Sequence, residues 1–338
     1  MVTAEWAPYR LDFRFTARTS RESMTYKDTY LVRLRDTDTG REAVGECALF
    51  RGLSADDVPD YEQRLSAACS RPCEPAAESS IRFGLESAMQ ALYPAGAESA
   101  FERGEAGIPI NGLIWMGDHE EMRRRIDAKL DAGFHVLKLK IGGIDFEAEL
   151  ALLEYIRGRY SPAALELRLD ANGSMTPDNA RDRLGRLAAH SIHSIEQPLR
   201  AGQTEATARL CEWSPIAIAL DEELIGADDP DALIAAIRPA YVILKPALCG
   251  GLSGATRWAD AAERAGIGWW ATSALESNVG LAAIARWVAR RGVSMPQGLG
   301  TGMLYHNNFA SPLELRGERL WSDPSRRLVI PDNLPWRQ

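Results

Sequence analysis

The stretch GFHVLKLKIGG, residues 133–143, contains two lysines, Lys138 and Lys140, in a run that otherwise has the composition of a buried strand. Side chains two positions apart on a strand point to the same face, roughly 6–7 Å from each other. Two ammonium groups at that distance repel each other, so an apolar strand would not keep both without partners. The pair therefore indicates that other charged groups meet this face of the strand.

From about residue 110 onward, strand-like runs alternate with stretches in which apolar residues recur at helical intervals of three and four. The expected strands lie in residues 111–117, 135–142, 165–173, 192–198, 216–223, 241–247, 266–274 and, with a weaker pattern, 296–302. The expected helices lie in residues 118–133, 145–160, 176–190, 204–213, 229–237, 254–266 and 278–292. This alternation predicts parallel βαβ units, and eight strands favour a closed barrel over an open doubly wound sheet.

The first hundred residues have a different pattern. Segments 9–15 and 28–36 have the pattern of antiparallel strands, and segments 56–70 and 78–93 that of helices. The expected fold is therefore α/β: a modified TIM barrel, (β/α)7β, with an N-terminal α+β capping domain completed by the C-terminal tail. The expected domains are residues 1–104 (capping domain), 105–305 (barrel) and 306–338 (tail returning to the capping domain).

Composition excludes several classes of partner. The net charge of −8 and the dispersed basic residues argue against nucleic acid. No apolar run approaches the roughly 20 residues that span a bilayer, and the start MVTAEWAPYR lacks the apolar core of a signal peptide. The five cysteines are odd in number and scattered, so we expect reduced thiols in a cytoplasmic protein. Nothing in the sequence specifies an oligomeric state.

Charged residues occupy the ends of five successive expected strands: Lys140, Asp170, Glu196, Asp221 and Lys245. Their separations of 30, 26, 25 and 24 residues each match about one βα unit. All five therefore lie at the C-terminal mouth, where barrel enzymes place their active sites. A single acid before a loop is usually a helix cap, and salt bridges across the mouth are the alternative for the set, but five residues in phase favour a site.

Three converging carboxylates require a cation, because like charges raise one another's pKa. An all-oxygen set suits a hard cation, so we expect Mg²⁺, with Mn²⁺ as a possible substitute. None of the five histidines joins this set, which disfavours a zinc hydrolase. A neighbouring ammonium, a metal ion and partial burial would each lower the pKa of a lysine toward the working range of a base. The expected chemistry is abstraction of the proton next to the carboxylate of a small molecule.

The motifs KLK (138–140), DAN (170–172), EQP (196–198), DEE (221–223) and LKP (244–246) on successive strands resemble the muconate-lactonising subgroup of the enolase superfamily. This superfamily is a known case of a lysine or histidine base working with magnesium. The resemblance implies Asp170, Glu196 and Asp221 as Mg²⁺ ligands, Lys140 as the base and Lys245 as the group that stabilises the enediolate. It also implies that Lys138 and Asn172 orient the base and a ligand.

The resemblance further implies substrate contacts from Ser273, Gly298, Gly300 and Ser20, the last in the loop 19–25 that would close over the mouth. A tight turn is the alternative for GLGTG (298–302), and a phosphate cradle is less expected. In DEE, the alternation of a strand puts Asp221 and Glu223 on one face, so residue spacing alone leaves the metal ligand open between them. The motif favours Asp221.

The implied activity is the syn dehydration of 2-succinyl-6-hydroxy-2,4-cyclohexadiene-1-carboxylate, a step of menaquinone biosynthesis. The alternative is a racemase of N-acylated amino acids or an epimerase of dipeptides, which uses the same two lysines. Dipeptide epimerases of the subgroup typically carry Asp-x-Asp on strand eight, where this chain has QGLGTG (297–302 with Pro296 before it), and acid-sugar dehydratases need a histidine on strand seven, which GIGWWATSALES (266–277) lacks. A metal-stabilised binding module is the non-enzymatic alternative.

Overall fold

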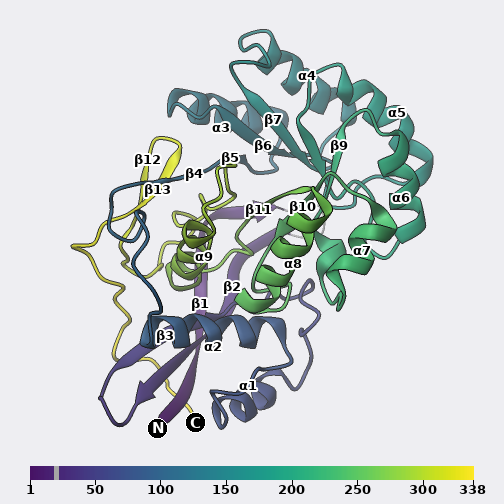
Figure 1. The fold of residues 1–338 in the computed structure, drawn as a ribbon. Helices are drawn as coiled ribbons and strands as arrows, with labels where there is room; N and C mark the ends of the chain where they lie inside the picture. Colours follow the sequence, from purple (N-terminus) through teal and green to yellow (C-terminus); the bar gives the residue numbers. More distant parts are fainter. Residues whose placement is uncertain (19–22) are drawn as a thin grey trace.

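The computed structural model describes residues 1–18 and 23–338. The N-terminal part contains an antiparallel sheet of β1 (Val2–Arg18), β2 (Ser23–Asp36) and β3 (Glu42–Cys47), in that order. Helices α1 (Tyr61–Cys69) and α2 (Ser79–Leu92) pack against this sheet and enclose a core of their own (Figure 1). This confirms the predicted α+β capping domain.

The second part is a parallel sheet with the order β11-β10-β9-β8-β7-β6-β5. Its strands are β5 (Gly112–Ile114), β6 (Val136–Lys140), β7 (Glu166–Asp170), β8 (Ser194–Glu196), β9 (Ala217–Leu220), β10 (Tyr241–Leu244) and β11 (Gly268–Ala271). The connecting helices are α3 (His119–Asp131), α4 (Phe146–Arg157), α5 (Pro177–Ala188), α6 (Thr204–Trp213), α7 (Pro230–Ile237) and α8 (Gly251–Ala265), and α9 (Asn278–Arg291) follows β11. Each expected strand and helix from residue 111 to 292 is present. The strands are short runs of mostly buried residues and the helices bury one face, so each type leaves its own spacing of apolar residues in the sequence.

The weak eighth strand is reduced to two bridging residues that close the barrel. Gln297 forms a parallel bridge with Ile110 on the β5 side, and Gly298 forms one with Thr272 at the end of β11. The amide of Gly298 donates to Ala271 O at 2.8 Å, and the amide of Gln297 donates to Pro109 O at 2.8 Å. The sheet therefore curls into a (β/α)7β barrel, and residues 297–298 connect its first strand to its last.

Gly298 makes this closure possible because it has no side chain. A Cβ at this position would lie 2.2 Å from Thr272 Oγ1, whereas a Cβ at Gly300 would come no closer than 3.4 Å to Ile110. We expect Gly298→Ala to lower the free energy of unfolding by about 1–3 kcal/mol through overpacking. Gly300→Ala is the matched control and should stay within about 0.5 kcal/mol in urea denaturation. Equal effects of the two substitutions would contradict this account of the closure.

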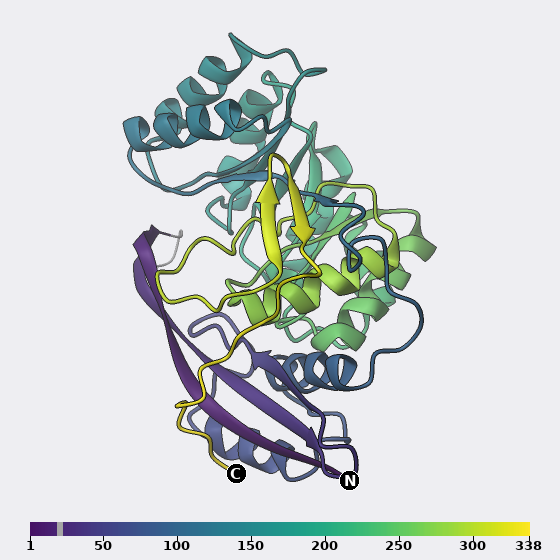
Figure 2. The same ribbon diagram turned by 90° about the vertical axis from the view of Figure 1, so that its left-hand side faces the viewer.

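The C-terminal tail leaves the barrel and returns to the capping domain. It first forms the hairpin β12 (Leu313–Arg316) and β13 (Arg319–Ser322), which pairs with β4 (Ile108–Pro109). Its end then pairs with β1, where the backbone amides and carbonyls of Trp6 and Arg337 exchange hydrogen bonds of 2.8 and 2.7 Å. Both termini lie at the same end of the molecule (Figure 2). We retain 1–104, 105–305 and 306–338 as proposed domain boundaries.

The barrel helices enclose the largest apolar core, and the capping domain has a separate one. The five cysteines are all free thiols. Among the described residues, no helix is long and apolar enough to cross a membrane.

Candidate active site at the barrel mouth

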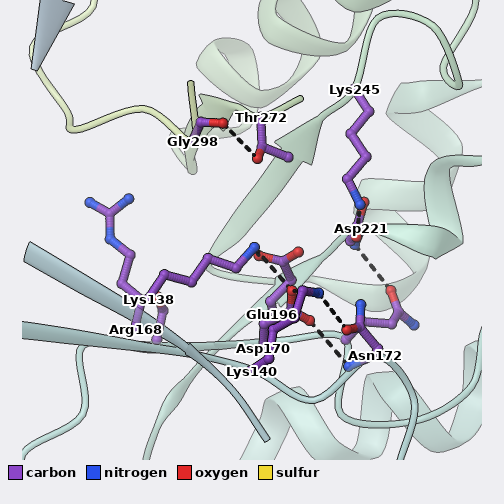
Figure 3. A network of polar contacts seen from close by, with 12 residues as sticks. Lys138, Lys140, Arg168, Asp170, Asn172, Glu196, Asp221, Lys245, Thr272 and Gly298 are labelled. Atoms are coloured by element: carbon purple, nitrogen blue, oxygen red, sulfur yellow. Dashed lines mark hydrogen bonds and ion pairs between the residues drawn. The ribbon is translucent and has the colours of Figure 1, made fainter. Parts of the chain in front are cut away.

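Strand register brings the predicted charged residues to one level. Lys140 pairs with Asp170 across β6 and β7, and Asp170 pairs with Glu196 across β7 and β8. Asp221 directly follows β9, and Lys245 directly follows β10. Three strands, β7, β8 and β9, lie between β6 and β10 in the barrel. Lys140 and Lys245 therefore approach the acids from opposite sides (Figure 3).

Ion pairs join these five residues and Lys138 in two groups, one around Lys138 and Asp170 and one formed by Lys245 and Asp221. Lys138 Nζ lies 3.1 Å from Asp170 Oδ2 and 2.5 Å from Glu196 Oε2. Lys140 Nζ donates to Asp170 Oδ2 at 2.9 Å and to Asn172 Oδ1 at 2.7 Å. Lys245 Nζ pairs with Asp221 Oδ2. The acids, rather than an apolar surface, are thus the partners of the two lysines on β6.

For Lys138 and Lys245, this pairing corrects the expectation that a neighbouring ammonium lowers the pKa of a lysine at this site. Burial favours the neutral form of Lys138, but the Asp170 and Glu196 carboxylates outweigh it and raise its pKa above the usual value. Lys245 behaves in the same way: burial acts against its charge, but Asp221 and its acidic neighbours raise the pKa. The opposite charges lie closer than the like ones, so attraction dominates in this arrangement.

The pKa values of Asp170 and Glu196 shift in opposite directions. Burial and the nearby Asp170 carboxylate raise the pKa of Glu196 well above its usual range. Burial acts in the same sense on Asp170, but Lys138 and Lys140 outweigh it and lower the pKa of this carboxyl group. The lysines thus favour the charged form of Asp170, whereas burial beside Asp170 disfavours the charged form of Glu196.

The same donor set fits a divalent cation. Glu196 Oε1 is buried and has no hydrogen-bond partner in the described structure, although a buried carboxylate oxygen normally has one. Asp170, Glu196 and Asp221 offer only oxygen atoms, the ligand type that Mg²⁺ prefers. Among residues 1–18 and 23–338, no three Asp, Glu, His or Cys side chains already form a group that could hold a metal ion. Lys138 bridges Asp170 and Glu196, and Lys245 pairs with Asp221, so these lysines would have to release the acids for a cation to bind.

The site opens into a cavity formed by both domains. Its floor includes Lys138, Lys140, Asp170, Asn172, Glu222 and Lys245, and its walls include residues 50–53, Leu113, Trp115, 272–275, Gly298 and Gly300. The side chains of Lys140 and Lys245 are 12% and 14% exposed, against 6% for Lys138. Lys140 and Lys245 are thus the lysines better placed to meet a bound molecule, and the Trp115 ring lies 5.9 Å from Lys140 Nζ.

The DEE run does not continue the strand alternation. β9 ends at Leu220, and residues Glu222–Leu224 form a 3₁₀ turn. This turn directs Glu223 away from the cavity, where it accepts from the Gly202 amide at 3.1 Å. Glu222 instead lines the cavity and accepts from Asn172 Nδ2 at 3.1 Å. The expectation that Asp221 and Glu223 share a face is therefore wrong.

Two backbone positions beside the acids have left-handed conformations. Asn172 has φ 42° and Gln197 has φ 41°, each one or two residues after a carboxylate of the site. Such conformations cost about 1–3 kcal/mol for non-glycine residues and persist only where surrounding contacts hold them. Gln197 Oε1 accepts a hydrogen bond from the backbone amide of Asp221 at 3.0 Å. The strained residue after Glu196 therefore helps to hold the backbone of Asp221 on the next strand.

The predicted substrate contacts have different positions. Ser273, Gly298 and Gly300 all line the cavity. Ser273 Oγ donates to Glu276 Oε2 at 2.5 Å and accepts from the Leu275 amide at 2.9 Å, so its hydroxyl is already engaged. Ser20 lies outside the described residues, as does most of the loop predicted to close the mouth. The contacts to substrate stay predictions.

Three cavity features escaped the sequence analysis: Glu222, Trp115 and the wall formed by residues 50–53. Trp115 follows β5 within an expected strand, so its position at a strand end was the available signal. The residues 50–53 come from the capping domain, and no spacing rule relates them to the barrel.

Residues 121–320 match the family described as "Enolase C-terminal domain-like". The chain is also 45% identical to the o-succinylbenzoate synthase of Desulfotalea psychrophila, over an alignment that covers 91% of this chain and 95% of the relative.

Two solved structures agree with this relationship. The crystal structure of MenC from Desulfotalea psychrophila has a TM-score of 0.79 and 40% identity, and the alignment covers 95% of this chain and 99% of that one. The dipeptide epimerase of Enterococcus faecalis, solved with Mg and L-Leu-L-Tyr, has a TM-score of 0.81 but 19% identity over 95% of this chain and 96% of that one, which shows a shared fold. The chain belongs to the enolase superfamily and, within it, to the o-succinylbenzoate synthase family.

Proposed function

We propose that the protein converts 2-succinyl-6-hydroxy-2,4-cyclohexadiene-1-carboxylate to o-succinylbenzoate, a dehydration in menaquinone biosynthesis. One observation carries the proposal: Lys140 and Lys245 both line the cavity, and each pairs with a buried carboxylate at the barrel mouth, Lys140 with Asp170 and Lys245 with Asp221. The 45% identity to an o-succinylbenzoate synthase supports this substrate over others of the superfamily.

The proposed cofactor is Mg²⁺, with Mn²⁺ as a possible substitute, and Asp170, Glu196 and Asp221 would hold it. When bound, a divalent cation supplies the positive charge that stabilises the second negative charge gained by the substrate carboxylate on deprotonation. Lys138, Lys140 and Lys245 now pair with these acids, so they must turn toward the cavity when the acids are engaged elsewhere.

Lys140 is the proposed base. Its Nζ takes the proton from the carbon next to the carboxylate, which breaks the C–H bond and leaves the electron pair in the enediolate. Lys140 then returns a proton to the hydroxyl leaving from the adjacent carbon on the same face. The C–O bond breaks, water departs and the ring becomes aromatic. Lys245 stays protonated on the opposite face and stabilises the developing negative charge.

An N-acylamino acid racemase is the second candidate, because lysines on both sides of the cavity could exchange a proton on either face of an α-carbon. The test is a panel assay of the purified, Mg²⁺-loaded protein. The cyclohexadiene acid is followed by formation of the aromatic product, and N-succinyl amino acids are followed by optical rotation. We expect kcat/KM for the cyclohexadiene acid to exceed that for every panel member. Racemisation without dehydration would refute the proposed function and favour the racemase.

The choice of Asp221 as metal ligand gives a separate prediction. We expect Asp221→Asn to weaken Mg²⁺ binding at least tenfold in calorimetric titration, because the site loses one of three charged oxygen ligands. Glu223→Gln is the matched control, because Glu223 is buried two residues away but faces Gly202 rather than the cavity. Weak Mg²⁺ binding by the Glu223 variant together with normal binding by the Asp221 variant would reverse the assignment.

A further inference from the structure

A second group of buried charges lies between the capping domain and the barrel. It consists of Lys27 on β2, Glu46 on β3 and Glu276 in the loop after β11, all almost inaccessible to solvent. None of these residues lines the cavity at the barrel mouth. Ionisable groups are rarely buried this deeply unless other charges and hydrogen bonds hold them, so the cluster requires an explanation.

Strand alternation points Lys27 at the barrel. Lys27, Thr29 and Leu31 occupy the same buried face of β2. Thr29 Oγ1 donates to Glu46 Oε1 at 2.9 Å, and Leu31 packs with Val279 at the start of α9. The capping domain thus inserts a lysine, rather than an apolar side chain, beside the loop that leads into α9.

Lys27 Nζ has no hydrogen-bond partner in the described part of the chain, and neither does Glu276 Oε1. Burial lowers the pKa of Lys27, whereas the charges of Glu46 and Glu276 act to raise it. Burial likewise raises the pKa of Glu276, against the opposing effects of Ser273 and Lys27. Burial therefore acts against the charged forms of both Lys27 and Glu276, and the opposite charge of the other residue acts in favour of each.

Hydrogen bonds connect Glu276 to the cavity wall. Its Oε2 accepts from Ser273 Oγ at 2.5 Å, and Ser273 Oγ accepts in turn from the Leu275 amide at 2.9 Å. The hydroxyl of Tyr305 donates to Leu275 O at 2.7 Å. Together these bonds hold Leu275 at φ 63°, a conformation unfavourable for a branched, non-glycine residue.

Leu275 belongs to the segment 272–275, which forms one wall of the cavity. We propose that Lys27 is a positioning residue: from the capping domain, and through Glu276 and Ser273, it holds this wall in the shape that accepts the substrate. The inference rests on the proposed function of the cavity. It assigns the capping domain a role in substrate binding that comes from its buried face rather than from the residues lining the mouth.

The test compares Lys27→Met with wild-type protein. Without the ammonium group, Glu46 and Glu276 face each other as buried acids, and the Ser273–Glu276 bond loosens. We expect KM for the cyclohexadiene acid to rise about tenfold while kcat stays within about threefold, because the wall affects binding and not the lysine chemistry. Lys129→Met is the matched control, since Lys129 is a partly buried lysine that lies on α3, outside the cavity.

The double variant Lys27→Met/Glu276→Gln separates positioning from general stability. A glutamine can still accept from Ser273 Oγ and carries no charge, so we expect the double variant to recover most of the KM lost in Lys27→Met. Unchanged KM in Lys27→Met, parallel losses of kcat and KM, or failure of the second substitution to restore KM would each overturn the proposal.

Hydrogen–deuterium exchange provides a readout that does not depend on turnover. We expect Lys27→Met to speed amide exchange in residues 272–277 more than in the barrel strands, and the double variant to restore protection. If wild-type protein lacks turnover, the proposed function fails, and the exchange pattern still decides whether Lys27 holds this segment. Unchanged exchange in residues 272–277 would refute the positioning role.

Discussion

Lys140→Ala is expected to lower kcat for dehydration by about 10²–10⁴-fold, the range that a positioned general base contributes. Lys140 Nζ bonds Asp170 and Asn172 at the cavity floor, 5.9 Å from the centre of the Trp115 ring, and its side chain is more exposed to the cavity than that of Lys138. Lys245 approaches from the opposite side and pairs with Asp221, so it cannot deliver a proton to the same face.

The measurement is the initial rate of formation of the aromatic product at saturating substrate. Circular dichroism and Mg²⁺ titration of the variant ensure that the fold and the acids are intact. Lys129→Ala provides a lysine substitution outside the cavity. A folded Lys140→Ala protein that binds Mg²⁺ and retains the wild-type rate would contradict the assignment of Lys140 as the base.

Glu46→Ala is expected to produce the largest loss of stability, about 2–4 kcal/mol in the free energy of unfolding. Glu46 is fully buried and accepts four hydrogen bonds, three of them across the domain interface. Its Oε1 accepts from Thr29 Oγ1 and from the Ser277 amide. Its Oε2 accepts from Ser277 Oγ and, at 3.0 Å, from the Gly280 amide. Because the last two residues begin α9, the carboxylate also meets the positive end of that helix.

Urea denaturation of Glu46→Ala, followed by fluorescence, tests this prediction. Glu42→Ala is the matched control because Glu42 lies on the same strand with its side chain 45% exposed, beside Arg35. We expect its effect to stay within about 0.5 kcal/mol, as for most surface ion pairs. Similar midpoints for the two variants would show that the interface does not depend on Glu46.

The sequence allowed the barrel to be predicted because its physical causes are local. Each strand from β5 to β11 is a short apolar run, and each following helix repeats apolar residues at three- and four-residue intervals. Separations of 24 to 30 residues, about one βα unit each, then located Lys140, Asp170, Glu196, Asp221 and Lys245 at the same end of the barrel without any contact information. The eighth strand was weak in the sequence because residues 297–298 supply only two isolated bridges.

The features that escaped prediction depend on turns and on contacts between distant segments. The turn at Asp221 breaks the strand alternation, and this places Glu222 rather than Glu223 in the cavity. The raised pKa of Lys138 depends on distances of 2.5 and 3.1 Å to carboxylates from two other strands. Spacing could bring these groups to one end of the barrel, but it could not determine which charges would lie closest.

The same limit applies to the interface between the domains. Lys27, Glu46 and Glu276 are far apart in the sequence, and each alone has the appearance of a surface residue. Only the packing of β2 and β3 against the start of α9 buries them together.

Metal-dependent turnover of the cyclohexadiene acid tests the central claim most directly. Purified protein is stripped with a chelator, assayed for formation of o-succinylbenzoate, and assayed again after Mg²⁺ is restored. The account predicts no measurable dehydration by the stripped protein and full recovery on addition of Mg²⁺, with Mn²⁺ as a possible substitute. Absence of conversion by the folded, Mg²⁺-loaded protein, or an undiminished rate after metal removal, would contradict it.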